Sequence, residues 1–373
     1  MSSNKPIRVI ISGGGTGGHI FPAVAIAQTL QRIDPTVELL FVGAEGKMEM
    51  TKVPAAGYKI IGLPIVGIQR RLTLKNLMVP FRIVQSLWRA RSVIGSFQPD
   101  IAIGVGGYAS GPLLRMAGWM GIPTLIQEQN SYPGVTNKIL ARKAIRICVA
   151  YDGLQKYFPA EKIVLTGNPV RPLVLSTSGK RDHGLVHFNL DHQRKTILVI
   201  GGSLGARTIN ESVERNLEAW QNAGLQIIWQ TGKAYFAQAQ KSAANFPHVR
   251  VFDFIAEMDL AYGVADLIVS RAGAMSISEL CIVGKPCILV PSPNVAEDHQ
   301  TKNAMALVNN TAAVLVADRD AREQLGHTLL QLAQDHEKCQ QLSANISKMA
   351  QTNASDKIAD TIFSIINEQV QSK

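Results

Sequence analysis

A short apolar strand, a glycine-rich loop and an amphipathic helix follow one another twice in this chain, and this repeated order restricts the folds open to it. The first copy passes from residues 7–12 into GGGTGG at 13–18, and the second from residues 196–200 into GGSLG at 201–205. This order is the opening unit of a nucleotide-binding α/β domain. Two copies about 190 residues apart predict two Rossmann-like domains with parallel sheets that face each other across a cleft. After the loops, apolar residues recur at helical spacing, as Ala23, Ile26, Ala27 and Leu30 in the first copy and Ile209, Val213 and Leu217 in the second.

Further β-branched runs alternate with helical patterns along both halves. They are VELLFVG, DIAIGVGG, PTLIQE and KIVLTG in the first half, and LQIIWQTG, VRVFDFI, DLIVS and PCILVP in the second. Such alternation indicates the α/β class, with parallel sheets and crossover helices.

A domain boundary is predicted at Pro169 and Pro172, because a polar stretch follows them before the next buried-type strand. We therefore expect domains at residues 1–168 and 169–354. The apolar spacing in SDKIADTIFSIINEQV predicts a closing helix at 355–371.

The composition is that of a soluble globular protein, with 46% apolar and 18% charged residues, and it excludes a disordered or coiled-coil chain. Four cysteines without a CxxC pair indicate a reducing compartment. No apolar run approaches the roughly 20 residues that cross a bilayer, and the N-terminal segment lacks a signal-peptide core. We expect a cytosolic chain.

The net charge of +10 is concentrated in the first half. Residues 1–170 carry 19 Lys and Arg against 8 Asp and Glu, whereas the remainder carries 19 against 20. A partner with negative charge is implied, such as anionic lipid or a phosphorylated substrate. We expect no nucleic acid partner, because neither a recognition-helix motif nor an aromatic-rich sheet accompanies the charge.

Residues 71–91 interleave bulky apolar side chains, such as Phe81 and Trp88, with five basic ones. Apolar groups within an acid-free basic surface suit an anionic membrane interface. An ordinary crossover helix whose apolar side is core explains the same pattern. The concentration of positive charge in the first half favours the interpretation as a membrane interface.

The first glycine loop has the spacing G-x-G-x-x-G and suits a phosphate, because glycines let the backbone approach an anion and the following helix presents its positive end. A dinucleotide site would need an acidic residue at the end of the second strand, which here ends at Gly43 with Glu45 beyond it. A second glycine loop, GVGGYASGP at 104–112, also follows a strand. It serves either a second anion or close packing of strand and helix.

His19 closes the first loop at a helix start, where a neutral imidazole could accept a proton. A histidine that only packs there is the alternative. In the second half Ser203 stands at another helix start, and Glu279 lies where a carboxylate can accept from both hydroxyls of a ribose. A solvent-facing Glu279 is the alternative. Gln300 opens a further helix and offers both a donor and an acceptor.

Signals for a Walker loop or a metal are poor. No Gly-Lys pair is followed by Ser or Thr. The sole D-x-D, Asp318-Arg319-Asp320, is interpreted as a set of helix caps. We expect neither a metal nor a cofactor.

Seven ordered motifs resemble those of the MurG family, within glycosyltransferase family 28. They are GGGTGGH, GVGGYASGP, EQN at 128–130, GNPVR at 167–171, GGSLGA, SRAGAMSISE and DHQ at 298–300. The resemblance covers nearly the whole chain and implies the GT-B fold, with the closing helix packed back on the first domain. It further implies a hexosyltransferase that moves N-acetylglucosamine (GlcNAc) from UDP-GlcNAc to undecaprenyl-diphospho-muramoylpentapeptide (lipid I), at the cytoplasmic face of the bacterial inner membrane.

The resemblance also assigns site residues. The candidate catalytic residues are His19 and Glu128. The UDP-GlcNAc contacts fall on Thr16, Gly17, Gly18, Asn130, Arg171, Ser203, Ile255, Ala274, Met275, Ser276, Ile277, Ser278, Glu279 and Gln300. The acceptor diphosphate falls to Gly14, Gly15, Gly106, Gly107 and Tyr108. Gln127 stands where the family often has His, so His19 or Glu128 must carry the proton transfer.

The implied reaction is an inverting single displacement, in which the base takes the proton of the acceptor 4-hydroxyl as its oxygen attacks C1 of GlcNAc and UDP leaves. Two alternatives share the donor. A UDP-GlcNAc 2-epimerase would need no lipid acceptor, and a non-catalytic nucleotide-sugar-binding protein would release no UDP.

Overall fold

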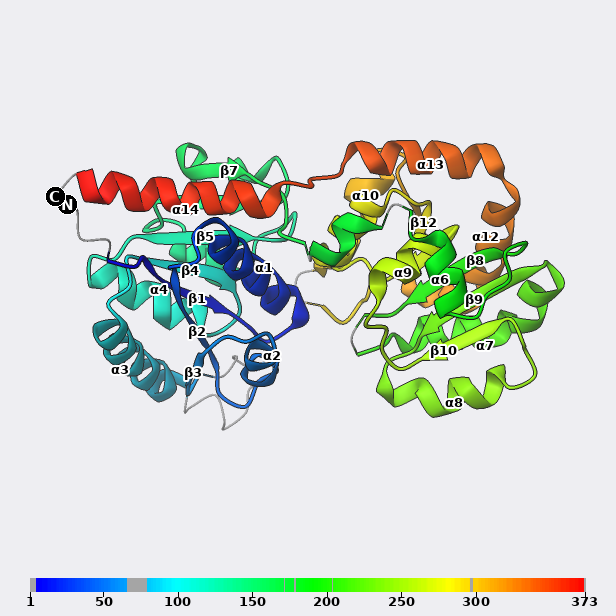
Figure 1. Ribbon diagram of the computed structural model, residues 1–373, viewed down its shortest axis with the longest axis horizontal. Coiled ribbons are helices and arrows are strands. Elements are labelled where there is room, and N and C mark those ends of the chain that lie inside the picture. The colour runs from blue at the N-terminus through cyan, green and yellow to red at the C-terminus, as the bar shows by residue number, and fades with distance from the viewer. Residues whose placement is uncertain are drawn as a thin grey trace. The chain divides into compact units, whose positions relative to one another are not determined.

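The computed structural model describes residues 5–65, 79–170, 172–177, 179–202, 204–295 and 298–371. The chain divides into two compact units (Figure 1). The first unit comprises Met1–Val170 with Asn353–Lys373, and the second comprises Arg171–Thr352.

The first unit is built on a seven-stranded parallel sheet of order β3-β2-β1-β4-β5-β6-β7. Its elements are β1 (Arg8–Gly13), α1 (Gly17–Ile33), β2 (Glu38–Ala44), α2 (Glu49–Ala55), β3 (Ile60–Leu63), α3 (Val79–Phe97), β4 (Ile101–Gly106), α4 (Ser110–Trp119), β5 (Thr124–Glu128), α5 (Val135–Leu140), β6 (Arg146–Val149), β7 (Ile163–Leu165) and α14 (Ala354–Gln371).

The second unit is built on a six-stranded parallel sheet of order β10-β9-β8-β11-β12-β13. Its elements are η4 (Pro172–Ser176), α6 (Arg181–His187), β8 (Lys195–Ile200), α7 (Arg207–Asn222), β9 (Leu225–Gln230), α8 (Lys233–Ala243), β10 (Val249–Phe252), α9 (Met258–Val264), β11 (Leu267–Ser270), α10 (Ala274–Val283), β12 (Cys287–Leu289), α11 (His299–Val308), β13 (Val314–Leu315), η6 (Asp318–Asp320), α12 (Ala321–Gln334) and α13 (His336–Lys348). The parallel sheets predicted from the alternating pattern are confirmed in both units.

Helices cover both faces of the first sheet, as the alternation of side chains along a strand requires. Ile10 of β1 packs with α3, α4 and α5 on one face. Its neighbours Val9 and Ile11 pack with α1 and α14 on the other. The closing helix α14 lies alongside α1 (Figure 1), where Ile358 and Ile362 are fully buried. The apolar faces predicted for α1 and α7 are buried as well.

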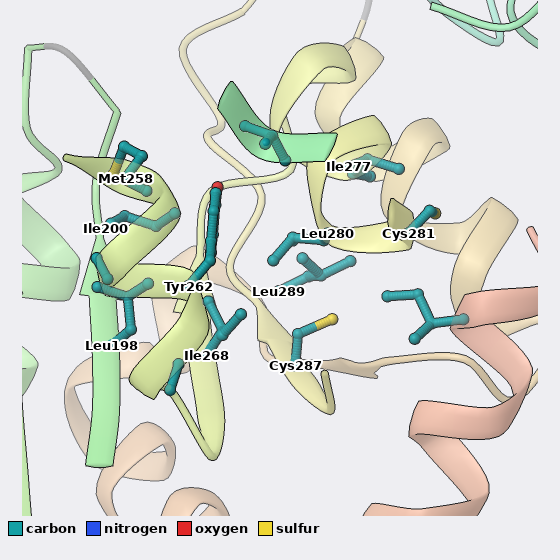
Figure 2. Close-up of a cluster of buried hydrophobic side chains, with 14 of the residues drawn as sticks. Leu198, Ile200, Met258, Tyr262, Ile268, Ile277, Leu280, Cys281, Cys287 and Leu289 are labelled. Atoms are coloured by element: carbon teal, nitrogen blue, oxygen red, sulfur yellow. The ribbon is translucent and has the colours of Figure 1, made fainter. Parts of the chain in front are cut away.

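The second sheet also has two buried faces. One packs against α7, α8 and α12. The other packs against α9, α10 and α11, and Figure 2 shows Tyr262 standing among its apolar side chains. Cys281 and Cys287 belong to the same cluster, where they pack as small buried hydrophobic residues. Burial raises the pKa of the Cys281 thiol to about 12.

Three strands, β3, β6 and β13, are not among those predicted from the sequence. They span four, four and two residues. Their strand conformation is specified by pairing with longer neighbours, β2, β5 and β12.

Candidate active site

The two glycine loops of the first unit lie against each other at the carboxyl ends of β1 and β4. The N–H of Gly14 donates to the carbonyl oxygen of Gly106 at 3.3 Å. A Cβ on Gly107 would lie 2.5 Å from the carbonyl oxygen of Gly14, and Gly107 has φ +91°, so a side chain at this position is excluded by both space and backbone. In open α/β sheets the carboxyl ends of the strands are where ligands bind. The structure thus brings the two loops together at one place.

His19 lies in the first turn of α1, half-buried beside both loops. Its Nδ1 is 2.9 Å from the carbonyl oxygen of Gly14. A carbonyl only accepts, so Nδ1 carries the hydrogen and the neutral imidazole keeps its lone pair on Nε2. A Cβ on Gly106 would lie 2.8 Å from Nε2. The arrangement therefore gives His19 one nitrogen that can accept a proton.

The N–H groups of Gly14 and Gly15 already have partners within the protein. Gly14 donates to Gly106, and Gly15 donates to Oε2 of Glu49 at 2.8 Å. Thr16, the N-cap of α1, makes no side-chain capping bond and is exposed. The start of α1 is therefore the part of this loop that is open to an anion, rather than the two glycines before it.

Glu128 is a buried carboxylate at the end of β5, 1% exposed. Its Oε1 accepts from the backbone N–H and the side-chain amide of Asn130, at 3.0 and 3.1 Å. Its Oε2 accepts from the N–H of Gly134 at 3.1 Å and from Asn137 Nδ2 at 2.8 Å. Four donors on two oxygens hold the loop after β5 in shape. They also favour His19 over Glu128 as the group that takes a proton.

Gln127, in the place where the family often has His, is fully buried in an amide network. Its Nε2 donates to Oδ1 of Asn168 at 3.0 Å, and Gln129 donates to Gln127 Oε1. The amide of Asn168 returns a bond to the carbonyl of Gln129 at 3.0 Å. Gln127 thus acts as a structural link between β5 and the segment after β7. Tyr108, within the second glycine loop, is half exposed.

In the second unit, α10 begins directly after β11. Gly273 is its N-cap, with no side-chain capping bond, and Ala274, Met275 and Ser276 are only partly buried. The first N–H groups of a helix attract anions. Further along, the side chain of Ile277 belongs to the core, and the hydroxyl of Ser278 donates back to the carbonyl of Ala274 at 3.0 Å. The first residues of α10 are therefore the ones suited to a phosphate.

Glu279 is 6% exposed and accepts from the hydroxyl of Tyr262 at 3.0 Å. The alternative of a solvent-facing Glu279 is wrong. Tyr262 comes from α9, and its ring lies in the core beside α10 (Figure 2). Sequence reasoning missed Tyr262, because nothing in its local sequence distinguishes it from another core aromatic residue.

Gln230, at the end of β9, joins two of the expected donor-binding segments. Its Oε1 accepts from the N–H of Ile255 at 3.0 Å, and its Nε2 donates to the carbonyl of Gly202 at 3.3 Å. The N–H of Ile255 is thus already engaged. Its carbonyl is therefore the backbone group that Ile255 could offer to a nucleobase. Gln300 acts similarly, since its Oε1 accepts from the N–H groups of Ala272 and Ser292 at 3.2 and 2.9 Å.

Two expected donor contacts, Arg171 and Ser203, lie outside the described residues. Among the residues that are described, no group of three or more His, Cys, Asp or Glu side chains could hold a metal ion. Asp318 pairs with Arg271 and accepts from Thr208 at 3.1 Å, and Asp320 precedes α12 without a side-chain capping bond. The interpretation of this pair as side-chain caps is therefore wrong, and Asp318 instead links β11 to α7.

Comparison with known proteins gives matches along almost the whole chain. Residues 9–149 match the glycosyltransferase family 28 N-terminal domain, and residues 196–362 match the family's C-terminal domain. A relative from Parabacteroides distasonis is 56% identical over 98% of this chain and 100% of its own length. One from Cytophaga hutchinsonii is 55% identical over 98% of this chain and 99% of its own. Both are named UDP-N-acetylglucosamine--N-acetylmuramyl-(pentapeptide) pyrophosphoryl-undecaprenol N-acetylglucosamine transferase.

Solved structures agree. The crystal structure of MurG from Acinetobacter baumannii matches with a TM-score of 0.78 and 31% identity, covering 96% of this chain and 100% of that one. A UDP-GlcNAc 2-epimerase from Neisseria meningitidis matches with a TM-score of 0.69 over 96% of this chain and 100% of that one, but its 15% identity shows a shared fold alone. The two units are those of the GT-B fold. The chain therefore belongs to the MurG family of glycosyltransferase family 28.

Proposed function

We propose that this chain transfers GlcNAc from UDP-GlcNAc to lipid I, giving lipid II for peptidoglycan synthesis. The observation that carries this proposal is the identity of 54–56% to relatives named for this reaction, over 97–98% of the chain. The epimerase alternative has less support, because its structural match lies at 15% identity. The enzyme is thus an N-acetylglucosaminyltransferase.

The donor is assigned mainly to the second unit. The start of α10 suits the diphosphate, because its N–H groups and helix dipole favour negative charge. Glu279, held by Tyr262, suits the ribose hydroxyls, and the carbonyl of Ile255 suits the N–H of uracil. Gln300, Arg171 and Ser203 complete this assignment as predictions from the family pattern. Helix N–H groups stabilise the charge that develops on UDP as it leaves.

The acceptor is assigned to the first unit. The acceptor diphosphate is assigned to the second glycine loop, at Gly106, Gly107 and Tyr108, since the N–H groups of Gly14 and Gly15 are already engaged. Thr16, Gly17 and Gly18 at the start of α1 stay with UDP-GlcNAc, as the family pattern assigns them. His19 is the proposed base, and Glu128 positions the loop that carries Asn130. As the acceptor 4-hydroxyl attacks C1 of GlcNAc from the face opposite UDP, its proton passes to Nε2 of His19. The C1–O bond to UDP breaks in the same step, so the product is β-linked.

Transfer of labelled GlcNAc from UDP-GlcNAc into lipid tests the function directly. We expect labelled lipid II and stoichiometric UDP. Formation of the 2-epimer without lipid, or binding without release of UDP, would replace the proposal with one of the alternatives.

The His19→Ala variant tests the base in the same assay. We expect kcat to fall by about 10²–10⁴-fold, the usual contribution of general base catalysis, while UDP still binds. His327→Ala is a matched control, because this exposed histidine lies on α12, a helix with no assigned part in the site. Near-normal turnover of His19→Ala would remove His19 as the base.

The outer face of α3 supports a further proposal, peripheral binding to an anionic membrane. Helix α3 is a crossover helix that buries Ala90 and Ile94, yet it exposes Phe81, Val84 and Trp88, the last by 70%. Spaced at i, i+3 and i+7, these three side chains share one side of the helix.

The neighbouring helix α4 carries a further exposed aromatic residue. It contacts α3 and ends at the exposed Trp119, with the guanidinium of Arg115 5.2 Å from its ring. Exposed basic residues accompany both helices, namely Arg82, Arg91, Arg115 and Lys143. The expected membrane residues before α3 lie outside the described part of the chain. Among the described helices, none has the length and apolar character needed to cross a membrane. We place the enzyme at the cytoplasmic face of the inner membrane, where a lipid-linked acceptor can be reached from the surface.

Sedimentation with anionic vesicles tests the membrane proposal. Trp88→Glu should weaken binding by about tenfold or more, and added salt should weaken it further. Val186→Glu is the control, because Val186 is equally exposed, at 76%, but lies on α6 in the second unit. Binding that is indifferent to salt and to Trp88→Glu would contradict the proposal.

A further inference from the structure

Glu49 is a buried carboxylate to which the reaction described above assigns no part. It lies at the start of α2 and is 1% exposed. Its Oε1 accepts from the N–H of Ala44 at 3.0 Å, and its Oε2 accepts from the N–H of Gly15 at 2.8 Å. One side chain therefore ties the end of β2 to the first glycine loop, 34 residues earlier in the sequence.

The bond to Gly15 continues toward His19 through a single peptide group. The N–H of Gly15 and the carbonyl of Gly14 belong to the same planar unit. That carbonyl accepts from Nδ1 of His19 at 2.9 Å. A chain of hydrogen bonds thus runs from the imidazole, through the Gly14–Gly15 peptide, to the carboxylate of Glu49. Hydrogen bonds in such a chain polarise and strengthen one another.

Glycines make room for the members of this chain of hydrogen bonds. A Cβ on Gly14 would lie 2.2 Å from Glu49 Oε1, and a Cβ on Gly43 would lie 2.5 Å from Glu49 Cγ. Glycines at these two positions thus provide the space that the carboxylate occupies. On the far side, the ring of His19 lies against Gly106. The peptide is held from both ends.

We propose that Glu49 is a positioning residue, which fixes the tautomer and orientation of His19 through the Gly14–Gly15 peptide. The inference rests on the proposed role of His19 as the base. An acceptor that holds the hydrogen on Nδ1 leaves the lone pair on Nε2, where the proton of the sugar hydroxyl has to arrive. A carboxylate bonded directly to a histidine has this effect in catalytic triads. Here a peptide group stands between the two.

The Glu49→Gln variant tests the proposal, because it keeps the size of the side chain but can present a carbonyl oxygen to only one of the two N–H groups. We expect kcat to fall by about tenfold or more, within the roughly 10²–10⁴-fold contributed by the base itself. The KM for UDP-GlcNAc should change by less than about twofold, which is well under 1 kcal/mol, because Glu49 is proposed to act through His19 and not on the donor.

The decisive measurement repeats this substitution in the His19→Ala background. A residue that acts only through His19 should cost less than about a further twofold once His19 is gone, because the two effects are not additive. A merely structural residue would lower kcat by the same factor in both backgrounds. That result, or a fully active Glu49→Gln enzyme, would overturn the proposal.

Asp100→Asn is the matched control. Asp100 also accepts a backbone N–H, from Arg8 at 2.7 Å, but it stands at the opposite end of β1 and β4 from the glycine loops. Its loss should lower the melting temperature without selectively lowering kcat. An equal loss of kcat in Asp100→Asn would show that any weakening of this sheet impairs turnover, and would overturn the specific role of Glu49.

The nitrogen NMR shifts of His19 in the unmodified enzyme provide a test that does not depend on a variant folding. With ¹⁵N-labelled histidine above about pH 8, where an ordinary imidazole is neutral, we expect the hydrogen on Nδ1. A hydrogen on Nε2 would overturn the proposal. If His19→Ala retains normal turnover, the proposed base falls instead, whatever the tautomer, so the two failures can be told apart.

Discussion

The hydrogen bond between Tyr262 and Glu279 offers a sharp test of how the donor is held. Tyr262→Phe removes one hydroxyl and keeps the ring in the core cluster of Figure 2. The lost bond is 3.0 Å long and buried, and a hydrogen bond to a charged group contributes about 1.5–3 kcal/mol. Suppose that about 1.5 kcal/mol of this hydrogen-bond energy holds the Glu279 carboxylate in the orientation that contacts the ribose. Its loss then lowers the fraction of enzyme with a correctly oriented Glu279 about tenfold.

We therefore expect the dissociation constant for UDP to rise about tenfold in Tyr262→Phe, measured by calorimetry, and kcat at saturating donor to change little. Tyr235→Phe is the control, because Tyr235 likewise donates its hydroxyl to a glutamate, Glu214, in the same unit. Tyr235→Phe should reduce the free energy of unfolding without changing the dissociation constant for UDP. An unchanged UDP affinity in Tyr262→Phe, or an equal loss in Tyr235→Phe, would refute the argument that Tyr262 orients Glu279 for the donor.

Two further predictions concern the second glycine loop and the buried thiols. Gly106→Ala places a Cβ 2.7 Å from the ring of His19, at a residue with φ +104°, and the backbone strain costs about 1–3 kcal/mol. We therefore expect kcat to fall while the affinity for UDP is kept. Unchanged turnover would contradict the packing of His19 on this loop. Burial raises the thiol pKa of Cys148 and Cys281 from 9.0 to about 12, so the neutral thiols stabilise the fold below about pH 9 and this stability is lost as the pH rises toward 12. At about pH 10 each thiol should lower the free energy of unfolding by about 1 kcal/mol. Equal free energies of unfolding by urea at about pH 8 and pH 10 would contradict this prediction.

The two strand–glycine loop–helix units show what local sequence can predict and what it cannot. Their strands, their helices and the apolar faces of α1 and α7 follow from short-range spacing, and the structure has them as predicted. The local pattern indicated that the first loop suits a phosphate, and the family resemblance assigned Gly14 and Gly15 to the acceptor diphosphate. Neither could detect that Gly106 and Glu49 already accept the N–H groups of these glycines, because both partners are distant in sequence and carry no motif.

The sequence by itself determined the α/β class, the parallel sheets, the family and the kinds of side chain available for the reaction, because these depend on hydrophobic period, glycine placement and ordered motifs. Only the tertiary structure decided which polar groups are already engaged. Glu128 and Gln230 hold loops, Glu279 is buried against Tyr262, and a peptide joins Glu49 to His19. The physical reason is that a buried polar group must find a partner wherever the fold brings one within about 3 Å, and crossover connections bring together residues that are dozens of positions apart.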